Sequence, residues 1–228
     1  MGFCLNMSKS SSRLIRVSDP ANSLTPNHKV SAKEPPVRIF QKDWMESFTL
    51  ISFRKFIIYC ITFEGILLFS IFYTHTPLIT FIIPLLIGVF LWLLFEYILH
   101  RFAFHFVSNN KKIQRLIYIF HGNHHIQPNH PFRTLMPIIV TLPIGLFIWS
   151  ISVYSIGFSL GTSFFMGFFS GYAIYDTIHY ATHNFKMRKF PLSLWKKHHL
   201  LHHYRTEEHN YSISLPFLDS IFRTKYKR

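Results

Sequence analysis

The chain has 228 residues, of which 49% are hydrophobic, 18% aromatic and only 15% charged, whereas roughly a quarter of an ordinary soluble domain is charged. This balance excludes an ordinary soluble domain and predicts an integral membrane protein. The formal net charge of +14 could also serve nucleic-acid binding. However, the sequence has no basic-aromatic RNA motif and no zinc-finger spacing, so we expect no nucleic-acid partner.

Residues 1–45 are predicted to form a disordered polar tail, and residues 46–228 to form a single membrane domain. The stretch that ends in Pro35-Pro36 is polar and rich in Ser, and it lacks the apolar core of a signal peptide. Cys4 lies in this tail and Cys60 in an apolar run, so we expect no disulfide between them.

Four apolar runs follow, each about long enough to cross the ~30 Å hydrocarbon core of a bilayer as a helix. They cover residues 56–73, 78–99, 137–156 and 158–175. Very short connections join the first run to the second and the third to the fourth. The runs therefore predict an all-α fold of about four transmembrane helices in two hairpins. The alternative left open is two true spans with buried or re-entrant hairpins.

The positive charges group on one side of this topology. Nine Lys and Arg precede residue 56, five lie in residues 100–133 and ten follow residue 185, with none in the short connections. The positive-inside rule then places both termini and the central loop in the cytosol, where the basic residues suit anionic lipid head groups. We expect an endoplasmic reticulum membrane in a eukaryote and an inner membrane in a bacterium.

Thirteen of the 15 histidines lie between residues 100 and 209, on the predicted cytosolic side, and they predict a histidine-rich helical cap. Eleven of them occur in the segments HRFAFH (100–105), HGNHH (121–125), HYATH (179–183) and HHLLHH (198–203). Residues at i, i+3 and i+4 share a helical face. We therefore expect His121, His124 and His125 to form one tridentate face, and His179 with His183 to form a pair.

The number of histidines indicates two metal ions. Ten imidazoles are too many for one ion, because zinc takes four ligands and iron about six. His100 and His105 lie about 140° apart on a regular helix, so each could serve a different ion unless the helix ends or bulges there. The sequence has no HExxH zinc-protease motif and no ExxH pair of a carboxylate-bridged bundle.

Together, the four histidine segments resemble the motifs of the fatty acid hydroxylase/sterol desaturase superfamily. Within it, EYILHRFAFH, FHGNHHIQPNHPFR and ISLPFLDSIFRT look most like the fatty acid 2-hydroxylase branch, over about residues 85–225. The resemblance implies a non-haem di-iron oxygenase, with zinc possible in the same sites. It implies O₂-dependent hydroxylation of a fatty acyl chain at the 2-position, free or in a ceramide-type lipid. The ligands that it implies are His100, His105, His121, His124, His125, His179, His183, His199, His202 and His203.

Two differences from relatives of this branch affect partners and specificity. Asn129 and His130 follow the HGNHH segment where such relatives often carry an acidic residue. About 55 residues precede the first span, with no HPGG haem motif, so we expect electrons to come from a separate cytochrome b5- or ferredoxin-like carrier. His198, next to His199, is the one histidine of HHLLHH that is not among the ten implied ligands.

Metal-bound histidines usually donate their second N–H to a carboxylate or carbonyl. Glu96 precedes His100 by four residues and Asp176 precedes His179 by three, so both are candidates for this role; Asp219 could instead anchor the C-terminal segment. Glu64, in mid-span, should face the bundle or a cavity. The histidines alone do not exclude a sterol, carotenoid or other lipid hydroxylase or desaturase, or a non-catalytic metal-binding membrane protein.

Overall fold

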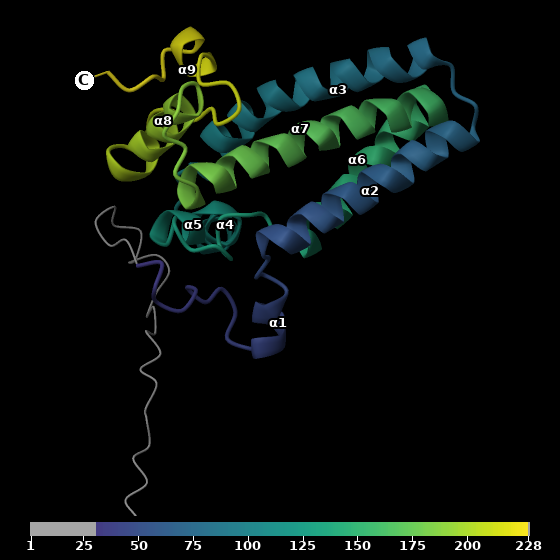
Figure 1. Cartoon of the computed structure of the whole chain (residues 1–228). Coiled ribbons are helices and arrows are strands. Elements are labelled where there is room, and N and C mark those ends of the chain that lie inside the picture. Colours follow the sequence, from purple (N-terminus) through teal and green to yellow (C-terminus); the bar gives the residue numbers. More distant parts are fainter. Residues whose placement is uncertain (1–30, 228) are drawn as a thin grey trace, which may run out of the picture.

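The structure is a computed structural model that describes residues 31–227, and these residues form helices and loops with no β-strand. Most of the length lies in a bundle whose helices run side by side (Figure 1). The bundle helices are α2 (Phe53–Tyr73), α3 (Leu78–Ile98), α6 (Ile138–Ile156) and α7 (Phe158–Asn184). The predicted all-α fold is confirmed, and residues 1–30 of the predicted tail lie outside the described residues.

Both predicted hairpins are present, and their turns lie at the same end of the bundle, far from α8 (Figure 1). The hydroxyl of Thr76 in the first turn donates to the hydroxyl of Ser159, just after the second turn, over 2.9 Å. The second turn is Gly157 alone, with φ at +83°, a conformation that glycine adopts without steric cost. The central loop and the C-terminal segment therefore meet at the opposite end.

Three of the four bundle helices are long and apolar enough to cross a membrane: α2, α6, and α3 together with the six residues after it. Their outward side chains are exposed and apolar, such as Phe69, Leu78, Leu86 and Phe147, as expected for surfaces that face lipid tails. The fourth helix, α7, lies between them and packs against α2, α3 and α6. Because its neighbours cover it, α7 can carry Ser, Thr and Gly as well as apolar residues.

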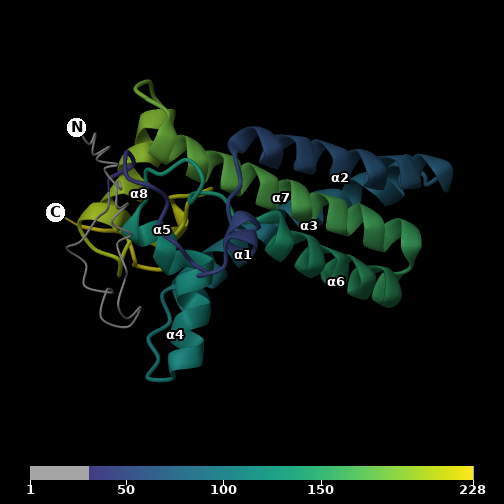
Figure 2. The ribbon, with the colours of Figure 1, turned by 90° about the horizontal axis from the view of Figure 1, so that it is seen from below.

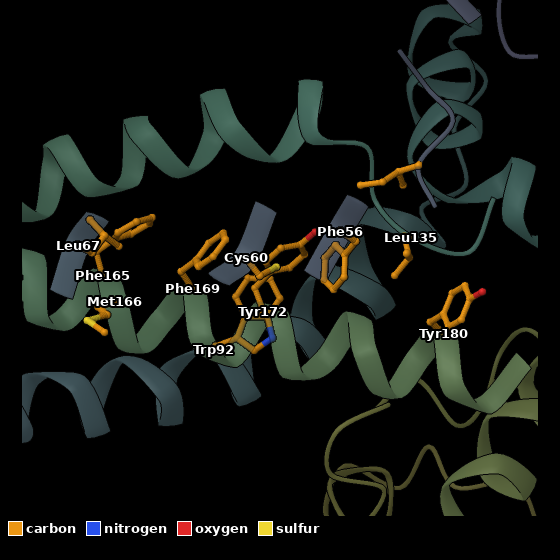
Figure 3. Packing of buried hydrophobic residues seen from close by; sticks show 11 residues of the cluster. Phe56, Cys60, Leu67, Trp92, Leu135, Phe165, Met166, Phe169, Tyr172 and Tyr180 are labelled. Carbon is orange, nitrogen blue, oxygen red and sulfur yellow. The ribbon is translucent and has the colours of Figure 1, made fainter. Parts of the chain in front are cut away.

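Small residues let α7 approach α3 very closely. A Cβ added at Gly167 would overlap the carbonyl oxygen of Leu85, and one added at Gly171 would lie 2.6 Å from the Cβ of Trp92. Around these contacts Trp92, Phe165 and other aromatic rings fill the centre of the bundle (Figure 3). Glu64, in the middle of α2, faces this bundle as expected, because its Oε1 accepts from the Ser170 hydroxyl over 2.6 Å.

Short helices form a cap over the end of the bundle that carries the histidines. They are η1 (Leu99–Phe104), α4 (Lys111–Ile117), η2 (Tyr118–Gly122), α5 (Asn123–Ile126), α8 (Leu192–Tyr204) and α9 (Leu218–Ile221). α8 packs on α7, and the Lys196 ammonium donates to the carbonyls of Thr182 and Phe185, 2.7 Å from each. A cation here satisfies the free carbonyls at the C-terminal end of α7. α4 projects away from the bundle (Figure 2).

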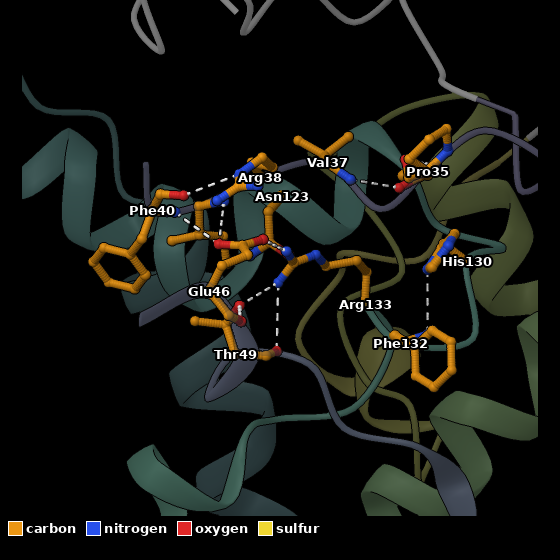
Figure 4. Close-up of polar contacts among 12 residues, drawn as sticks. Pro35, Val37, Arg38, Phe40, Glu46, Thr49, Asn123, His130, Phe132 and Arg133 are labelled. Atoms are coloured by element: carbon orange, nitrogen blue, oxygen red, sulfur yellow. Dashed lines mark hydrogen bonds and ion pairs between the residues drawn. The ribbon is translucent and has the colours of Figure 1, made fainter. Parts of the chain in front are cut away.

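The segment before the bundle, which includes α1 (Asp43–Ser47), lies against the cap. Gln127 accepts from the backbone N–H of Val37 over 2.9 Å, and the buried Arg133 guanidinium donates to Glu46 and to Thr49 (Figure 4). Residues 31–45 belong to the predicted disordered tail, yet Val37 and Ile39 are buried. The polar composition of this stretch does not reveal these contacts, since backbone groups make several of them.

The close α3–α7 contact gives a stability prediction with a matched control. We expect Gly167→Ala to destabilise the protein by about 1–3 kcal/mol, the usual cost of overpacking, because backbone atoms of Leu85 would have to move. Gly65→Ala on α2 is the control, since its new Cβ would meet nothing within 4 Å and alanine favours a helix. Thermal unfolding in detergent measures both; equal midpoints would contradict the prediction.

Candidate metal centre

All ten candidate ligands lie in two compact groups of five. Within each group, one potential ligand atom per residue lies within 4.8 Å of those of all the others. Group 1 consists of His100, His105, His121, His125 and His202. Group 2 consists of His124, His179, His183, His199 and His203. Nine of the ten are buried, His105 being only half-buried. The structure thus gathers the ten predicted residues into two groups, each of which could hold a metal ion.

The two HxxHH segments are divided between the groups. His121 and His125 join group 1 while His124 joins group 2, and in α8 the pair His199 and His203 joins group 2 while His202 joins group 1. The expected tridentate face is therefore wrong: residues at i and i+4 share a group, and the residue between them points to the other group. The His124 and His203 Nε2 atoms lie 3.1 Å apart.

A π-helix explains how His100 and His105 reach the same group. They lie at the start and just after the end of η1, and their Nε2 atoms are 3.3 Å apart. A π-helix closes its hydrogen bonds from i to i+5, so side chains five apart share a face. The alternative that each histidine serves a different ion is therefore wrong, and the bulge that the sequence left open is present.

Backbone carbonyls fix the ring orientation of two group 1 histidines. The His100 Nδ1 lies 2.5 Å from the carbonyl oxygen of Tyr211, and the His202 Nδ1 lies 2.7 Å from that of His209. A carbonyl only accepts, so each Nδ1 carries the proton and each Nε2 presents a lone pair to the group.

Polar side chains lie near the Nδ1 atoms of three further histidines. The His125 Nδ1 is 3.0 Å from a carboxylate oxygen of Glu207, and the His183 Nδ1 is 3.4 Å from the Asn129 side-chain oxygen. The His179 Nδ1 is 3.7 Å from Asp176 Oδ1. The other oxygen of Asp176 accepts from the Met136 N–H and the Tyr172 hydroxyl. Asp176 thus lies beside His179, as its spacing indicated, and also anchors the start of the α6 connection.

Glu96 does not contact His100, contrary to the expectation from its spacing. Its carboxylate accepts from the backbone N–H groups of Ile213 and Ser214, over 2.9 and 2.8 Å, and from the Ser212 and Ser214 hydroxyls. The Nδ1 of His100 reaches the carbonyl of Tyr211 instead. Glu96 therefore fixes the chain next to Tyr211 and acts on His100 only through that segment.

Asp219 anchors the same segment from the other side. It accepts from the N–H groups of Tyr211 and Ser212, both over 2.9 Å, and from the Thr224 hydroxyl. His198 lies 2.9 Å from it through Nε2 and belongs to neither group. The histidine that the motif left over therefore holds the C-terminal segment. His130 is also outside both groups; its Nδ1 accepts from the Phe132 N–H over 3.3 Å (Figure 4).

Burial favours the neutral form of several of these imidazoles. Desolvation, followed by the neighbouring imidazoles, lowers the pKa of His121, His199, His202 and His203 well below the usual value of 6.5. Neutral imidazoles whose lone pairs converge repel one another, and a shared cation removes that repulsion. Because a metal needs deprotonated ligands, each group can hold a metal ion.

An apolar cavity of about 360 Å³ leads to the histidines. It lies among α3, α4, α6 and α7, with mostly apolar walls, and it reaches His124 and His179 of group 2. Some of its lining residues are also exposed at the surface: Phe95, Ile113, Leu116 and Ile144. The volume falls in the roughly 300–1,000 Å³ range of small-molecule sites. Such a cavity accepts an apolar chain that comes from the lipid phase.

The partners of the imidazole Nδ1 atoms were mostly missed by sequence reasoning. Backbone carbonyls, such as that of Tyr211, have no sequence signal. Glu207 lies in a polar stretch without a helical spacing to His125. Asn129 could have been found, since it stands out next to the HGNHH segment, and it also donates to the Tyr204 hydroxyl over 3.0 Å.

Known proteins that are similar to this chain in sequence and fold have closely related descriptions. A family model described as fatty acid hydroxylase matches residues 85–224. The dihydroceramide fatty acyl 2-hydroxylase FAH1 of Arabidopsis thaliana is 29% identical over 203 residues, covering 86% of this chain and 82% of that protein. The ceramide very long chain fatty acid hydroxylase scs7 of Schizosaccharomyces pombe is 34% identical over 159 residues, or 67% of this chain.

The match covers only 45% of the Schizosaccharomyces pombe protein, so the chain spans less than half of that relative's length. A solved structure described as full-length scs7p, with only the hydroxylase domain visible, superposes with a TM-score of 0.71 at 25% identity. That superposition covers 81% of this chain and 70% of the other.

Fold and site together define an integral membrane protein of helical hairpins whose buried histidines can bind metal. The matching family model covers more than half of the chain, and the chain belongs to the fatty acid hydroxylase family. Its class is therefore that of membrane oxidoreductases that hydroxylate fatty acids, as the motifs indicated.

The lowered histidine pKa values give a pH prediction for the metal-free protein. Between the folded pKa and the unfolded value near 6.5, the unfolded chain binds more protons, so stability falls as pH falls. Each such histidine lowers the free energy of unfolding by up to about 1.4 kcal/mol for each pH unit in this window. We expect the thermal midpoint in detergent to drop between about pH 7 and pH 5. Exposed His75→Gln is the control and should leave the profile unchanged; a flat wild-type profile would contradict the prediction.

The anchoring by Glu96 predicts an indirect effect on group 1. Glu96→Ala leaves the buried N–H groups of Ile213 and Ser214 without an acceptor, at about 1–3 kcal/mol each. We expect metal affinity to fall about 10–100-fold, as for other groups that orient metal ligands. Metal titration of the purified protein measures this. Glu64→Ala removes a different buried carboxylate, in mid-bundle, and should leave the affinity near wild type; equal losses would refute the assignment.

Proposed function

We propose that this chain is a non-haem di-iron oxygenase that hydroxylates a fatty acyl chain at the 2-position. The acyl chain is free or part of a sphingolipid or ceramide-type lipid, O₂ is the co-substrate, and residues 46–228 form the hydroxylase domain. One iron binds to the five histidines of group 1 and the other to the five of group 2, where zinc can also bind.

The observation that carries this proposal is the apolar cavity that ends at buried histidines. The walls exclude water and present no charge along most of their length, which suits a hydrocarbon chain. Five imidazoles per ion are few enough to leave a coordination position open on iron. When bound, the two irons supply the activation of O₂ that hydroxylation of an unactivated C–H bond requires.

The protein's own groups provide position and protonation state. The cavity walls hold the acyl chain with its 2-carbon beside His124 and His179. Tyr211 and His209 keep the Nδ1 protons of their histidine partners in place through their carbonyls. The Nε2 atoms therefore stay unprotonated and face the ions, which fixes the ligand geometry before substrate binds.

The names of similar proteins support the 2-position and the lipid class. FAH1 is described as a dihydroceramide fatty acyl 2-hydroxylase, and a Homo sapiens protein 33% identical over 144 residues is described as a fatty acid 2-hydroxylase. A sterol or carotenoid hydroxylase or desaturase would need a cavity for fused or branched ring systems. A non-catalytic metal-binding protein would have no use for the cavity.

We place the cap on the cytosolic face, in the endoplasmic reticulum of a eukaryote or the inner membrane of a bacterium. Within residues 31–227, the Lys and Arg belong to the segments at the cap end of the bundle, while the two hairpin turns lack Lys and Arg, in accord with the positive-inside rule. Electrons come from a separate cytochrome b5- or ferredoxin-like carrier that reaches the metal centre from the cytosol.

Expression in a host without 2-hydroxylated acyl chains tests the proposal. We expect 2-hydroxy fatty acids to appear in the hydrolysed lipids, detected by mass spectrometry, and to depend on O₂. His202→Gln should reduce the product by more than about tenfold, since even groups behind the ligands usually cost 10–100-fold.

His198→Gln is the matched control on the same helix. The glutamine amide can still donate to Asp219, so we expect the product to stay near the wild-type amount. Loss of product in the His198 variant with retention in the His202 variant would refute the ligand assignment. A hydroxylated sterol, or a hydroxyl group at another carbon, would refute the proposed substrate or position.

A further inference from the structure

The acyl cavity runs along α7 from the metal centre toward the hairpin turns. On α7 it is lined at one end by His179 and at the other by Phe165. These residues are fourteen apart, or about 21 Å at 1.5 Å per helical residue. One leaflet of a bilayer holds acyl chains over about 15 Å, half of the ~30 Å hydrocarbon core. The cavity is therefore deep enough for a whole acyl chain.

The deep end is lined by Phe165 on α7 and by Gly145 and Ile148 on α6. Gly145 on α6 is buried and lines the cavity opposite Phe165. A Cβ added at Gly145 would lie 3.4 Å from Cζ of the Phe165 ring, at ordinary contact distance. The Phe165 side chain is only 1% exposed, so it is held in place by the packing around it. The end of the ring therefore stands across the cavity at the level of Gly145.

Beyond Ile148 and Phe165, toward the hairpin turns, the backbones of α6 and α7 touch, because a Cβ added at Gly161 would lie 2.6 Å from the carbonyl oxygen of Ser152. On the other side of α7, beside the cavity, Gly167 packs directly on Leu85 of α3. Backbone contacts of this kind do not move aside as a flexible side chain does. The cavity thus ends at a fixed depth.

We infer that Gly145 and Phe165 form the floor of the acyl cavity and set the longest acyl chain that the protein accepts; this inference rests on the proposed function. The substrate enters with its tail toward Phe165 and its carbonyl toward the histidines. A chain that is too long cannot bring its 2-carbon to the metal centre, because its tail meets the floor first.

Substitutions at the floor should move the chain-length preference in opposite directions. Gly145→Leu places a branched side chain in the deep end and should favour shorter chains. Phe165→Leu removes the ring end that faces Gly145 and should favour longer ones. One methylene in an apolar pocket changes selectivity by about tenfold or more, so we expect at least about a tenfold change in the ratio of long to short products.

The test uses the full chain in membranes of a host that lacks 2-hydroxylated lipids. Cells receive an equimolar mixture of deuterated palmitic, stearic, arachidic, behenic and lignoceric acids, and the 2-hydroxy products are quantified by mass spectrometry. Phe147→Leu is the matched control, since this ring lies on α6 with 66% of its surface exposed and does not line the cavity. Gly145→Ala, whose Cβ fits at contact distance, gives a smaller shift and guards against misfolding.

A second measurement tests the selection of chain length independently of hydroxylation. The same fatty acids are added to the purified variants in detergent, and the increase in thermal midpoint is followed as a function of chain length. Opposite shifts of the optimum in the Gly145 and Phe165 variants, with none in Phe147→Leu, support the floor. An optimum that is the same in all variants overturns it. Fatty acids that stabilise the wild type and follow these shifts, without any hydroxylated product, support the floor and contradict the proposed function.

Discussion

Ten imidazoles in so small a volume can bind metal only if each is neutral and turns a lone pair, and not a proton, toward the position of the ion. The rest of the cap is organised by this requirement. Burial favours the neutral form of several rings, and acceptors outside the two groups hold the Nδ1 protons of His100 and His202. Those acceptors are themselves fixed: Glu96 and Asp219 bind the backbone on both sides of the Tyr211 carbonyl. The C-terminal segment is thus as much a part of the centre as the helices that carry the ligands.

Hydropathy and charge predicted most of the bundle. The apolar runs correspond closely to α2, α3 and α6, and the two short connections are the two turns. They did not show that α7 is the central helix, continues to Asn184 and carries His179 and His183 on its last turns. A covered helix can tolerate polar residues, so its hydropathy says little about its depth. The packing of residues 31–45 on the cap was also hidden, because backbone groups make several of those contacts.

The resemblance to a known family indicated which ten histidines gather, but the spacing did not show how they divide. An ideal helix would place His121, His124 and His125 on one face and would separate His100 from His105. In the structure two groups lie on either side of each HxxHH segment, and η1 has a wider turn than an α-helix. Both departures are small rotations of side chains around a helix axis. Spacing rules resolve a face of the helix, whereas the two groups lie closer together than that, since the ring centroids of His125 and His203, one from each group, are 4.2 Å apart.

The division of each HxxHH segment between the two groups has a consequence for how the centre assembles. α8 and the short helix around His124 each supply histidines to both groups, so neither helix can rotate to improve one group without disturbing the other. Under the proposed function, an ion bound to one group would therefore fix both helices and position the histidines of the other group. Such coupling would make the loading of the two sites cooperative.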